Sequence, residues 1–512
     1  MILIDTKTLA LHVPDYADSI QKYAILSHTW GPAQDEVTYE EMLVPPKDRP
    51  ERTLAKPGYS KIVETCARAA SSRYKLPYAW IDTCCINKAS SAELSEAINS
   101  MFRYYKEAEV CFAYLADVTD SGSSFNASRW FRRGWTLQEL IAPKDLVFYG
   151  CRWGFRGTKA TMAGRITEIT GIPGAILEHK AELSEIPVAQ RFSWASDRTT
   201  TRDEDVAYSL LGIFDINMAM LYGEGSKAFI RLQEHILSEN ADDSIFLWNE
   251  PFSYHKLTGI LATHPKSFRQ MRSIIAEPSF RPRDFHLTNR GVRLKLGLAW
   301  EEDTGLAIFP VKHSLGTAGK SAGVYLRRVG TDLFVRARPQ DCPTVKTEVT
   351  YTEFTAMKSL TGKQATTILD TVMRVVKPVD VRITRVVPQG LWDPASQFLH
   401  ATHTGAILGY LELKKDPYPQ FAFIFFFRNG HWSATVVKGE EWLSIQKSNF
   451  YSHYKHNIDE LRYFDTMGDA RMSKIERVPP TSKVLTVHMR VARGTGRPHL
   501  DIKEVDRKGS TS

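Results

Sequence analysis

Trp135 and Glu139 stand four residues apart, and on a helix this spacing places both side chains on one face. A carboxylate can stabilise positive charge that develops during a reaction, and an aromatic ring attracts a cationic group. Trp30, just after an expected strand, offers a second ring for stacking. A glutamate on an amphipathic helix is ordinarily solvated or in a salt bridge, and a tryptophan is more often a core residue. The spacing alone therefore leaves both interpretations open.

Polar residues stand at the ends of two expected strands. Ser27 and His28 end the apolar run that starts near Lys22, and Asp82 ends the run that starts at Tyr78. Ligands of open α/β sheets bind outside the carboxyl ends of the strands, which is where these three side chains fall. Asp82 as a turn cap and His28 as a structural histidine are the alternative interpretations.

Two other groups of residues suggest chemistry that the sequence does not favour. Cys84 and Cys85 with His28 suggest a thiol nucleophile. Adjacent residues on a strand point to opposite faces and the surroundings are apolar, so we expect packed thiols instead. His400 and His403 have no third ligand nearby in the sequence, so we expect no metal site.

Strand and helix signals alternate over the first 150 residues. Short apolar runs predict strands at 22–27, 78–82, 110–115 and 146–149, and apolar residues at helical spacing predict three helices, one after Ser60, one after Ser90 and one at 128–141. Ser60 is a natural N-cap, and Ser90 with Glu93 matches a capping box. Repeated strand–helix–strand units predict a parallel sheet flanked by helices, which is an α/β fold.

The remainder of the chain changes character twice. Residues 164–239 carry helical signals, clearest at 203–213 and 226–237. From Ser244 onward, β-branched and aromatic runs between turn residues predict a mainly β part, a sandwich or barrel-like domain. Its expected strands are 245–248, 292–298, 306–311, 324–328, 333–337, 382–387, 406–413, 421–427, 432–437 and 484–491.

The composition is that of a soluble globular protein, with 43% hydrophobic and 24% charged residues. No apolar stretch is long enough to span a membrane, and the first residues lack a secretory signal, so we expect a cytoplasmic protein with reduced cysteines. The first 240 residues carry a net charge of −4 and the rest +12. The basic part has no recognisable reading motif, so nucleic acid is not an expected partner.

Five stretches follow one another along the first 240 residues: Tyr23–Gly31 (YAILSHTWG), Trp80–Asn87 (WIDTCCIN), Trp130–Leu140 (WFRRGWTLQEL), Thr200–Leu210 (TTRDEDVAYSL) and Leu221–Gln233 (LYGEGSKAFIRLQ). Together they resemble the heterokaryon incompatibility (HET) domain family of filamentous fungi, which acts in self/non-self recognition. The resemblance implies a HET domain at 1–240, with an α/β core at about 20–150 and a helical appendage at about 160–240. A mainly β domain of unknown role at 241–505 and a tail at 506–512 would follow.

HET domains in turn resemble TIR domains, whose flavodoxin-like fold serves as an assembly module or as an enzyme that cleaves NAD. This second resemblance implies that Glu139 is the catalytic carboxylate, which stabilises or traps the ribosyl cation as in glycoside hydrolysis. Trp135 or Trp30 would stack on a ring of NAD. Ser27 or His28 would bind ribose or phosphate, Asp82 would lie beside them, and the Arg133 guanidinium would bind the diphosphate through two hydrogen bonds. NAD would be a substrate, and no cofactor would be required.

The family resemblance also supports a rival without catalysis. In it, the same surfaces bind other HET or receptor-type proteins, the chain self-associates on activation, and the β domain supplies specificity. Both hypotheses place the protein in incompatibility or immune-type programmed cell death. The sequence identifies neither the trigger nor the partner.

Overall fold

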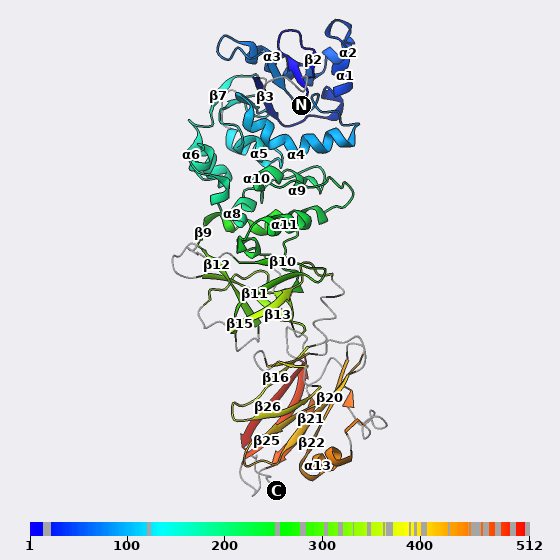
Figure 1. Ribbon diagram of the computed structural model, residues 1–512. Helices are drawn as coiled ribbons and strands as arrows, with labels where there is room; N and C mark the ends of the chain where they lie inside the picture. Colours follow the sequence, from blue (N-terminus) through cyan, green and yellow to red (C-terminus); the bar gives the residue numbers. More distant parts are fainter. Residues whose placement is uncertain are drawn as a thin grey trace. The chain divides into compact units, whose positions relative to one another are not determined.

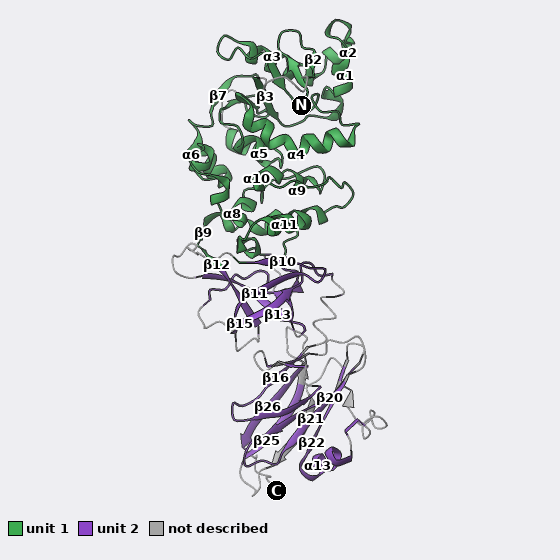
Figure 2. Cartoon of the chain, in the orientation of Figure 1, with its two compact units in different colours: residues 1–249, 261–283, 312–319 green, residues 250–260, 284–311, 320–512 purple. Residues whose placement is uncertain are grey.

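A computed structural model gives the fold of the chain in two compact units (Figures 1 and 2). Unit 1 comprises residues 1–249, 261–283 and 312–319, and unit 2 comprises 250–260, 284–311 and 320–512. Unit 1 thus includes segments beyond residue 240, the predicted end of the first domain. The described residues are all except 14–21, 120–123, 251–256, 277–282, 302–305, 316–320, 331, 346–349, 362–363, 365–371, 389–390, 394–396, 401–406, 429–430, 449, 452–461, 464–469, 477–482, 492–497 and 507–512.

The centre of unit 1 is a seven-stranded sheet of order β2-β1-β4-β3-β5-β6-β7. The strands are β1 (Leu3–Asp5), β2 (Leu11–His12), β3 (Tyr23–His28), β4 (Tyr78–Trp80), β5 (Val110–Tyr114), β6 (Leu146–Tyr149) and β7 (Phe155–Thr158). The inner strands β4, β3, β5 and β6 are parallel to one another, whereas β1, β2 and β7 pair antiparallel with their neighbours. The predicted α/β sheet is confirmed, with antiparallel strands at both edges that the sequence did not predict.

Helices cover both faces of this sheet. The main ones are α3 (Pro57–Ala70), α4 (Ser91–Glu107) and α5 (Thr136–Ile141). Helix α3 begins after Lys56 with Pro57 in its first turn, so the prediction that Ser60 is its N-cap is wrong. Ser90 does cap α4 by accepting the amide N–H of Glu93, but the Glu93 carboxylate accepts from Asn87 at 3.1 Å.

The predicted helix over 128–141 is wrong, because the segment is broken in the middle. A 3₁₀ helix, η4 (Arg129–Arg132), and helix α5 are separated by extended backbone at Arg133. Gly134 donates its N–H to the carbonyl of Thr199 at 2.8 Å, and Thr199 donates to the carbonyl of Arg132 at 2.6 Å. A contact with a distant segment therefore ends the helical run.

The helical appendage of unit 1 follows β7. It contains α6 (Ala163–Thr170), α7 (Gly174–Leu177), α8 (Val188–Ser193), α9 (Asp205–Tyr208), α10 (Leu211–Phe214) and α11 (Lys227–Glu239). Helix α11 matches its prediction closely, whereas the predicted helix 203–213 consists of two short helices. The predicted strand 245–248 is wrong, since Asp243–Phe246 form the 3₁₀ helix η6.

Unit 2 is mainly β-strands, with helix α13 (Gly439–Ser448) after β22. A first sheet contains β10 (Phe285–Leu287), β11 (Val292–Glu301), β12 (Leu306–Leu315, whose last residues belong to unit 1), β13 (Ser321–Arg328), β14 (Leu333–Ala337) and β15 (Thr350–Ala356). Two further sheets share one apolar core and so form a sandwich. They consist of β16 (Val372–Val376), β17 (Arg382–Val387), β18 (Trp392–Asp393), β19 (Phe398–His400), β20 (Ile407–Lys414), β21 (Phe421–Arg428), β22 (His431–Lys438), β23 (Arg462–Tyr463), β24 (Ala470–Glu476), β25 (Lys483–Val491) and β26 (Pro498–Asp506). The mainly β prediction for this part is confirmed.

Within the described part of the chain, every helix falls short of the length and apolar character that a membrane crossing needs.

Candidate functional site

The last two residues of β3 point to opposite faces of the sheet, as neighbours on a strand must. The Ser27 hydroxyl lies against α5, where it donates to Oε2 of Glu139 at 2.5 Å and accepts the indole N–H of Trp130 at 2.8 Å. His28 lies against α3, with Nδ1 at 3.2 Å from Nζ of Lys61. Helices α5 and α3 therefore cover opposite faces at this end of β3.

Glu139 is buried, with 3% of its surface exposed, and its carboxyl faces the carboxyl end of β3. Burial, together with the negative charge of Asp82, raises the pKa of Glu139 to about 8, although hydrogen bonds from Ser27 and Tyr105 and the charge of Arg133 oppose the rise. At neutral pH the carboxyl therefore holds a proton. The predicted catalytic residue is placed beside the strand end, but below the surface.

Asp82 contacts two other residues of the site, His28 and Trp30. Its Oδ1 lies 3.2 Å from Nε2 of His28, and its Oδ2 accepts the indole N–H of Trp30 at 2.9 Å. Burial raises the pKa of Asp82, but the hydrogen bond from His28 and the charges of Lys88 and Arg133 outweigh it, so the pKa lies below its ordinary value. Asp82 is thus a carboxylate that orients both the histidine and the tryptophan.

Trp30 is the exposed aromatic residue of the group, with 39% of its surface accessible. Nζ of Lys88 lies 4.0 Å from its ring centroid, and the guanidinium carbon of Arg133 lies 5.3 Å from it. Neither cation has a salt bridge to a carboxylate among the described residues. The two positive charges are therefore available beside an exposed ring.

Trp135 does not meet Glu139. It occupies the N-cap position of α5 rather than the helix itself, and its side chain hydrogen-bonds Asp205 in the appendage. Burial raises the pKa of Asp205 although hydrogen bonds from Tyr222 and Trp135 oppose the rise. Trp135 has helical backbone angles at this N-cap position, so the expected shared face with Glu139 stays a prediction, while the Trp135 side chain is bound to Asp205.

A surface cleft of about 680 Å³ lies next to this group. Its lining comes from the segment after β3, including Trp30, from the segment at the end of β5, including Tyr114, and from the first two turns of α3, including Lys61. The chain leaves β3 toward β4 on one side and leaves β5 toward β6 on the other, so the cleft lies where the strand order reverses. Glu139 and Ser27 do not line it.

The predicted site residues Ser27, His28, Trp30, Asp82, Arg133 and Glu139 are therefore brought together, and Trp135 lies apart from them. The sequence did not indicate Lys88 or Tyr105 as site residues. Lys88 stands in a loop without a distinctive pattern, and Tyr105 fits the apolar spacing of its helix. Their roles depend on the segments that the fold brings beside them.

The thiol alternative has no geometric support. Cys84 and Cys85 are both buried, and burial together with a hydrogen bond to Cys84 raises the pKa of Cys85 well above its ordinary value. His28 faces Asp82 and Lys61 instead. The prediction of packed thiols therefore fits this environment.

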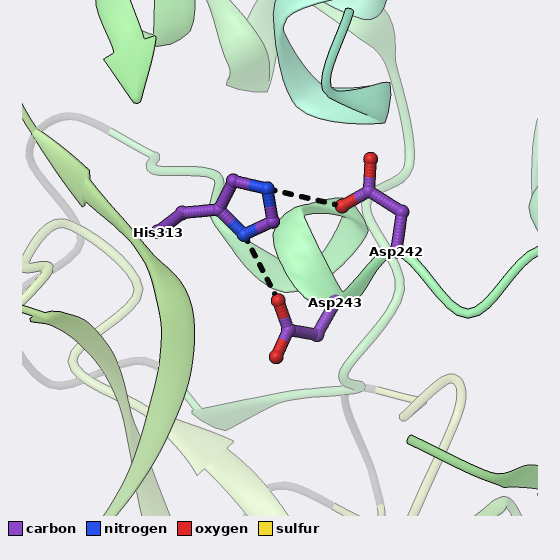
Figure 3. A group of neighbouring side chains, drawn as sticks. All are labelled: Asp242, Asp243 and His313. Atoms are coloured by element: carbon purple, nitrogen blue, oxygen red, sulfur yellow. Dashed lines mark hydrogen bonds and ion pairs between the residues drawn. The ribbon is translucent and has the colours of Figure 1, made fainter. Parts of the chain in front are cut away.

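A second polar cluster, Asp242, Asp243 and His313, lies elsewhere in unit 1 (Figure 3). Nδ1 of His313 is 3.0 Å from Asp243 and Nε2 is 3.5 Å from Asp242, so the two carboxylates face different nitrogens of the ring. Asp243 also pairs with Arg283. One ligand atom from each of the three residues lies within 4.8 Å of the others, a spacing that could hold a metal ion, while the pairing of Asp243 with Arg283 makes the group part of a buried ion-pair network. His403, considered with His400 as a metal ligand from the sequence alone, lies outside the described residues.

Comparison with known proteins gives a family match for the first part of the chain. Residues 23–127 match the family described as heterokaryon incompatibility protein (HET). The Vegetative incompatibility protein HET-E-1 of Podospora anserina is 46% identical over 228 residues. The chain carries a HET domain. The match covers 42% of this chain but 16% of that much longer relative, and no solved structure matches the chain.

Proposed function

We propose that this chain acts in heterokaryon incompatibility as a cell-death effector, and that its HET domain cleaves NAD between nicotinamide and ribose. The observation that carries the proposal is the convergence of Ser27, Asp82 and Tyr105 on a buried carboxyl, Glu139, at the carboxyl end of β3. The printed name of its relative, an incompatibility protein, supports the biological role.

The strand order supports the fold that the TIR resemblance implies. The four parallel strands lie in the order β4-β3-β5-β6, which in order of appearance is second, first, third, fourth. This is the order of the first four strands in flavodoxin-like sheets, which bind their ligand where the order reverses. The cleft between the ends of β3 and β5 lies at that place.

The exposed residues suit the parts of a dinucleotide. Trp30 offers an aromatic face for a base or for the cationic nicotinamide ring. Lys88 and Arg133 flank that ring and would bind the diphosphate, the arginine through its planar fork. Asp82 holds the Trp30 indole in place through a hydrogen bond of 2.9 Å.

The chemistry requires Glu139 to lose its proton. As the bond between nicotinamide and C1′ of the ribose breaks, nicotinamide leaves with the electron pair and the ribose becomes an oxocarbenium ion. Ionised Glu139 stabilises this cation or traps it, and water then adds to C1′ and releases a proton. Because a nearby cation lowers the pKa of a carboxyl, the positively charged pyridinium itself favours ionisation of Glu139.

Access to Glu139 requires a rearrangement of the residues that cover it. In the structure 3% of the Glu139 surface is exposed, so a substrate reaches the carboxyl only when these residues move. Self-association on activation would supply the free energy for this opening, because binding of the open state shifts the population toward it.

The test is nicotinamide release from NAD by the purified full chain at high concentration, with and without a crowding agent. Glu139→Gln should abolish release, since the amide cannot ionise, whereas the exposed Glu168→Gln on α6 should leave it unchanged. Release that persists in Glu139→Gln would rule out this residue as the catalytic group. No release by the wild type under any of these conditions would favour the second candidate.

The second candidate is a signalling module that binds other HET or receptor-type proteins without catalysis. It is favoured by one observation: Glu139 is buried, hydrogen-bonded, and absent from the lining of the cleft. Cell death in an incompatibility assay separates the two candidates. If death persists unchanged with folded Glu139→Gln, the interaction module is the better account.

A further inference from the structure

The stretch Thr200–Leu210 and the two residues before it hold the turn that precedes Glu139. Gly134 and Arg132 exchange backbone hydrogen bonds with Thr199 at 2.8 and 2.6 Å. A Cβ atom on Gly134 would lie 2.5 Å from Cγ2 of Thr200, so the two segments approach as closely as a glycine permits. The appendage is therefore packed directly against this turn.

Arg198 is the side chain at the centre of this contact, and 5% of its surface is exposed. Its Nη1 donates to the carbonyl of Arg133 at 2.8 Å and to Oγ1 of Thr136 at 2.9 Å, and its Nε donates to the carbonyl of Trp194 at 3.3 Å. Thr136 begins α5 three residues before Glu139, a spacing at which helical side chains are neighbours. Nη2 of Arg198 is buried without a hydrogen-bond partner among the described residues.

The charges around Glu139 give Arg198 a second role. Arg133, which lowers the pKa of Glu139, is half-exposed, whereas Arg198, on which the charge of Glu139 acts, is buried on the side of the appendage. Burial lowers the pKa of Arg198 to about 9, and the charge of Glu139 opposes this, so the guanidinium stays protonated at neutral pH. Electrostatic attraction is stronger in a buried environment than in water. The titratable or polar groups facing the carboxyl are Ser27 from β3, Tyr105 from α4, Cys111 from β5, Asp82 after β4, Arg133 from the turn and Arg198 from the appendage.

We propose that Arg198 is a positioning residue for Glu139: its guanidinium fixes the turn between Arg133 and Thr136 and supplies the buried positive charge that compensates the ionised carboxylate. The appendage would thereby regulate the reactive carboxyl of the α/β core. The catalytic consequence rests on the proposed NAD cleavage, whereas the electrostatic consequence can be measured whether or not the domain is an enzyme.

The test compares three variants of the full chain: Arg198→Met, which removes the charge at similar length; Arg198→Lys, which keeps the charge without the planar fork; and Arg191→Met as a control. Arg191 is also buried in the appendage, where it donates to the carbonyl of Ile213. In each background the pH at which Glu139 ionises is measured, from the difference in stability between that protein and its Glu139→Gln derivative.

Arg198→Met should move the ionisation midpoint of Glu139 upward by about one pH unit, which is a roughly tenfold higher proton affinity of the carboxylate. Arg198→Lys should leave the midpoint near that of the wild type. It should speed hydrogen exchange at the Gly134 amide, because a lysine ammonium cannot make the same set of hydrogen bonds as the planar guanidinium. Arg191→Met should leave the midpoint unchanged. An unchanged midpoint in folded Arg198→Met would overturn the proposal. If that variant does not fold, unchanged Gly134 exchange in Arg198→Lys would overturn it.

Nicotinamide release distinguishes this inference from the proposed function. If the wild type cleaves NAD, Arg198→Met should lower kcat about tenfold or more with KM nearly unchanged, because the substrate-binding side chains remain in place. If the wild type cleaves no NAD but the midpoint moves as expected, the proposed function fails and the inference about Arg198 stands.

Discussion

Replacement of Glu139 with glutamine tests whether the buried carboxyl is neutral in the folded protein. Burial, with the nearby Asp82, raises its pKa from 4.5 to about 8. The folded state therefore holds this proton more tightly than the unfolded chain does. The resulting stability is complete below the unfolded pKa of 4.5 and is lost as the pH rises to about 8. At about 1.4 kcal/mol for each pH unit, the total loss is on the order of 5 kcal/mol, as an upper limit.

Glutamine keeps the size of the side chain and an acceptor for Ser27 but cannot ionise. Glu139→Gln should therefore match the wild type in stability near about pH 5 and exceed it by ~3–5 kcal/mol near about pH 9. Urea unfolding of the full chain is measured at both pH values. Hydrogen exchange of the amides in β3 and β5 serves as the readout, so that the stability of this domain alone is obtained. Glu168→Gln, at an exposed position on α6, is the control and should show no such pH dependence. An equal effect of Glu139→Gln at both pH values would refute the reasoning.

Three further predictions follow from the same contacts. Gly134→Ala should destabilise unit 1 by about 1–3 kcal/mol in urea unfolding, because its Cβ would meet Thr200; wild-type stability would show that the segments can separate. Asp243→Asn should cost about 3–5 kcal/mol in the same measurement, since it removes the buried carboxylate that pairs with Arg283 and lies beside the His313 ring, and a cost below about 1 kcal/mol would contradict the ion-pair network. If the chain cleaves NAD, kcat/KM should fall about tenfold for each pH unit below about 8, as free Glu139 becomes protonated, and a flat profile would exclude this carboxyl as the titrating group.

Much of the sheet could be predicted from the sequence, because a buried strand shows itself locally as an apolar run. The strand Leu146–Tyr149 was predicted with its observed bounds, and the strands of the β unit at 333–337 and 382–387 were as well. The predicted helix over 128–141 failed for a non-local reason. Its apolar spacing is helical, but Arg132 and Gly134 form backbone hydrogen bonds with Thr199 instead of continuing the helix.

The site shows the same division between local and tertiary information. The sequence by itself identified the family stretches and placed Ser27, His28 and Asp82 at strand ends, because both signals lie within a few neighbouring residues. Only the tertiary structure decided that Ser27 meets Glu139 across 112 residues of sequence, and that Trp135 turns instead to Asp205. The pKa of Glu139 was likewise beyond the sequence, because it depends on burial and on charges from separate elements. Side-chain type can be read along the chain, whereas distance and solvent exposure are set by packing.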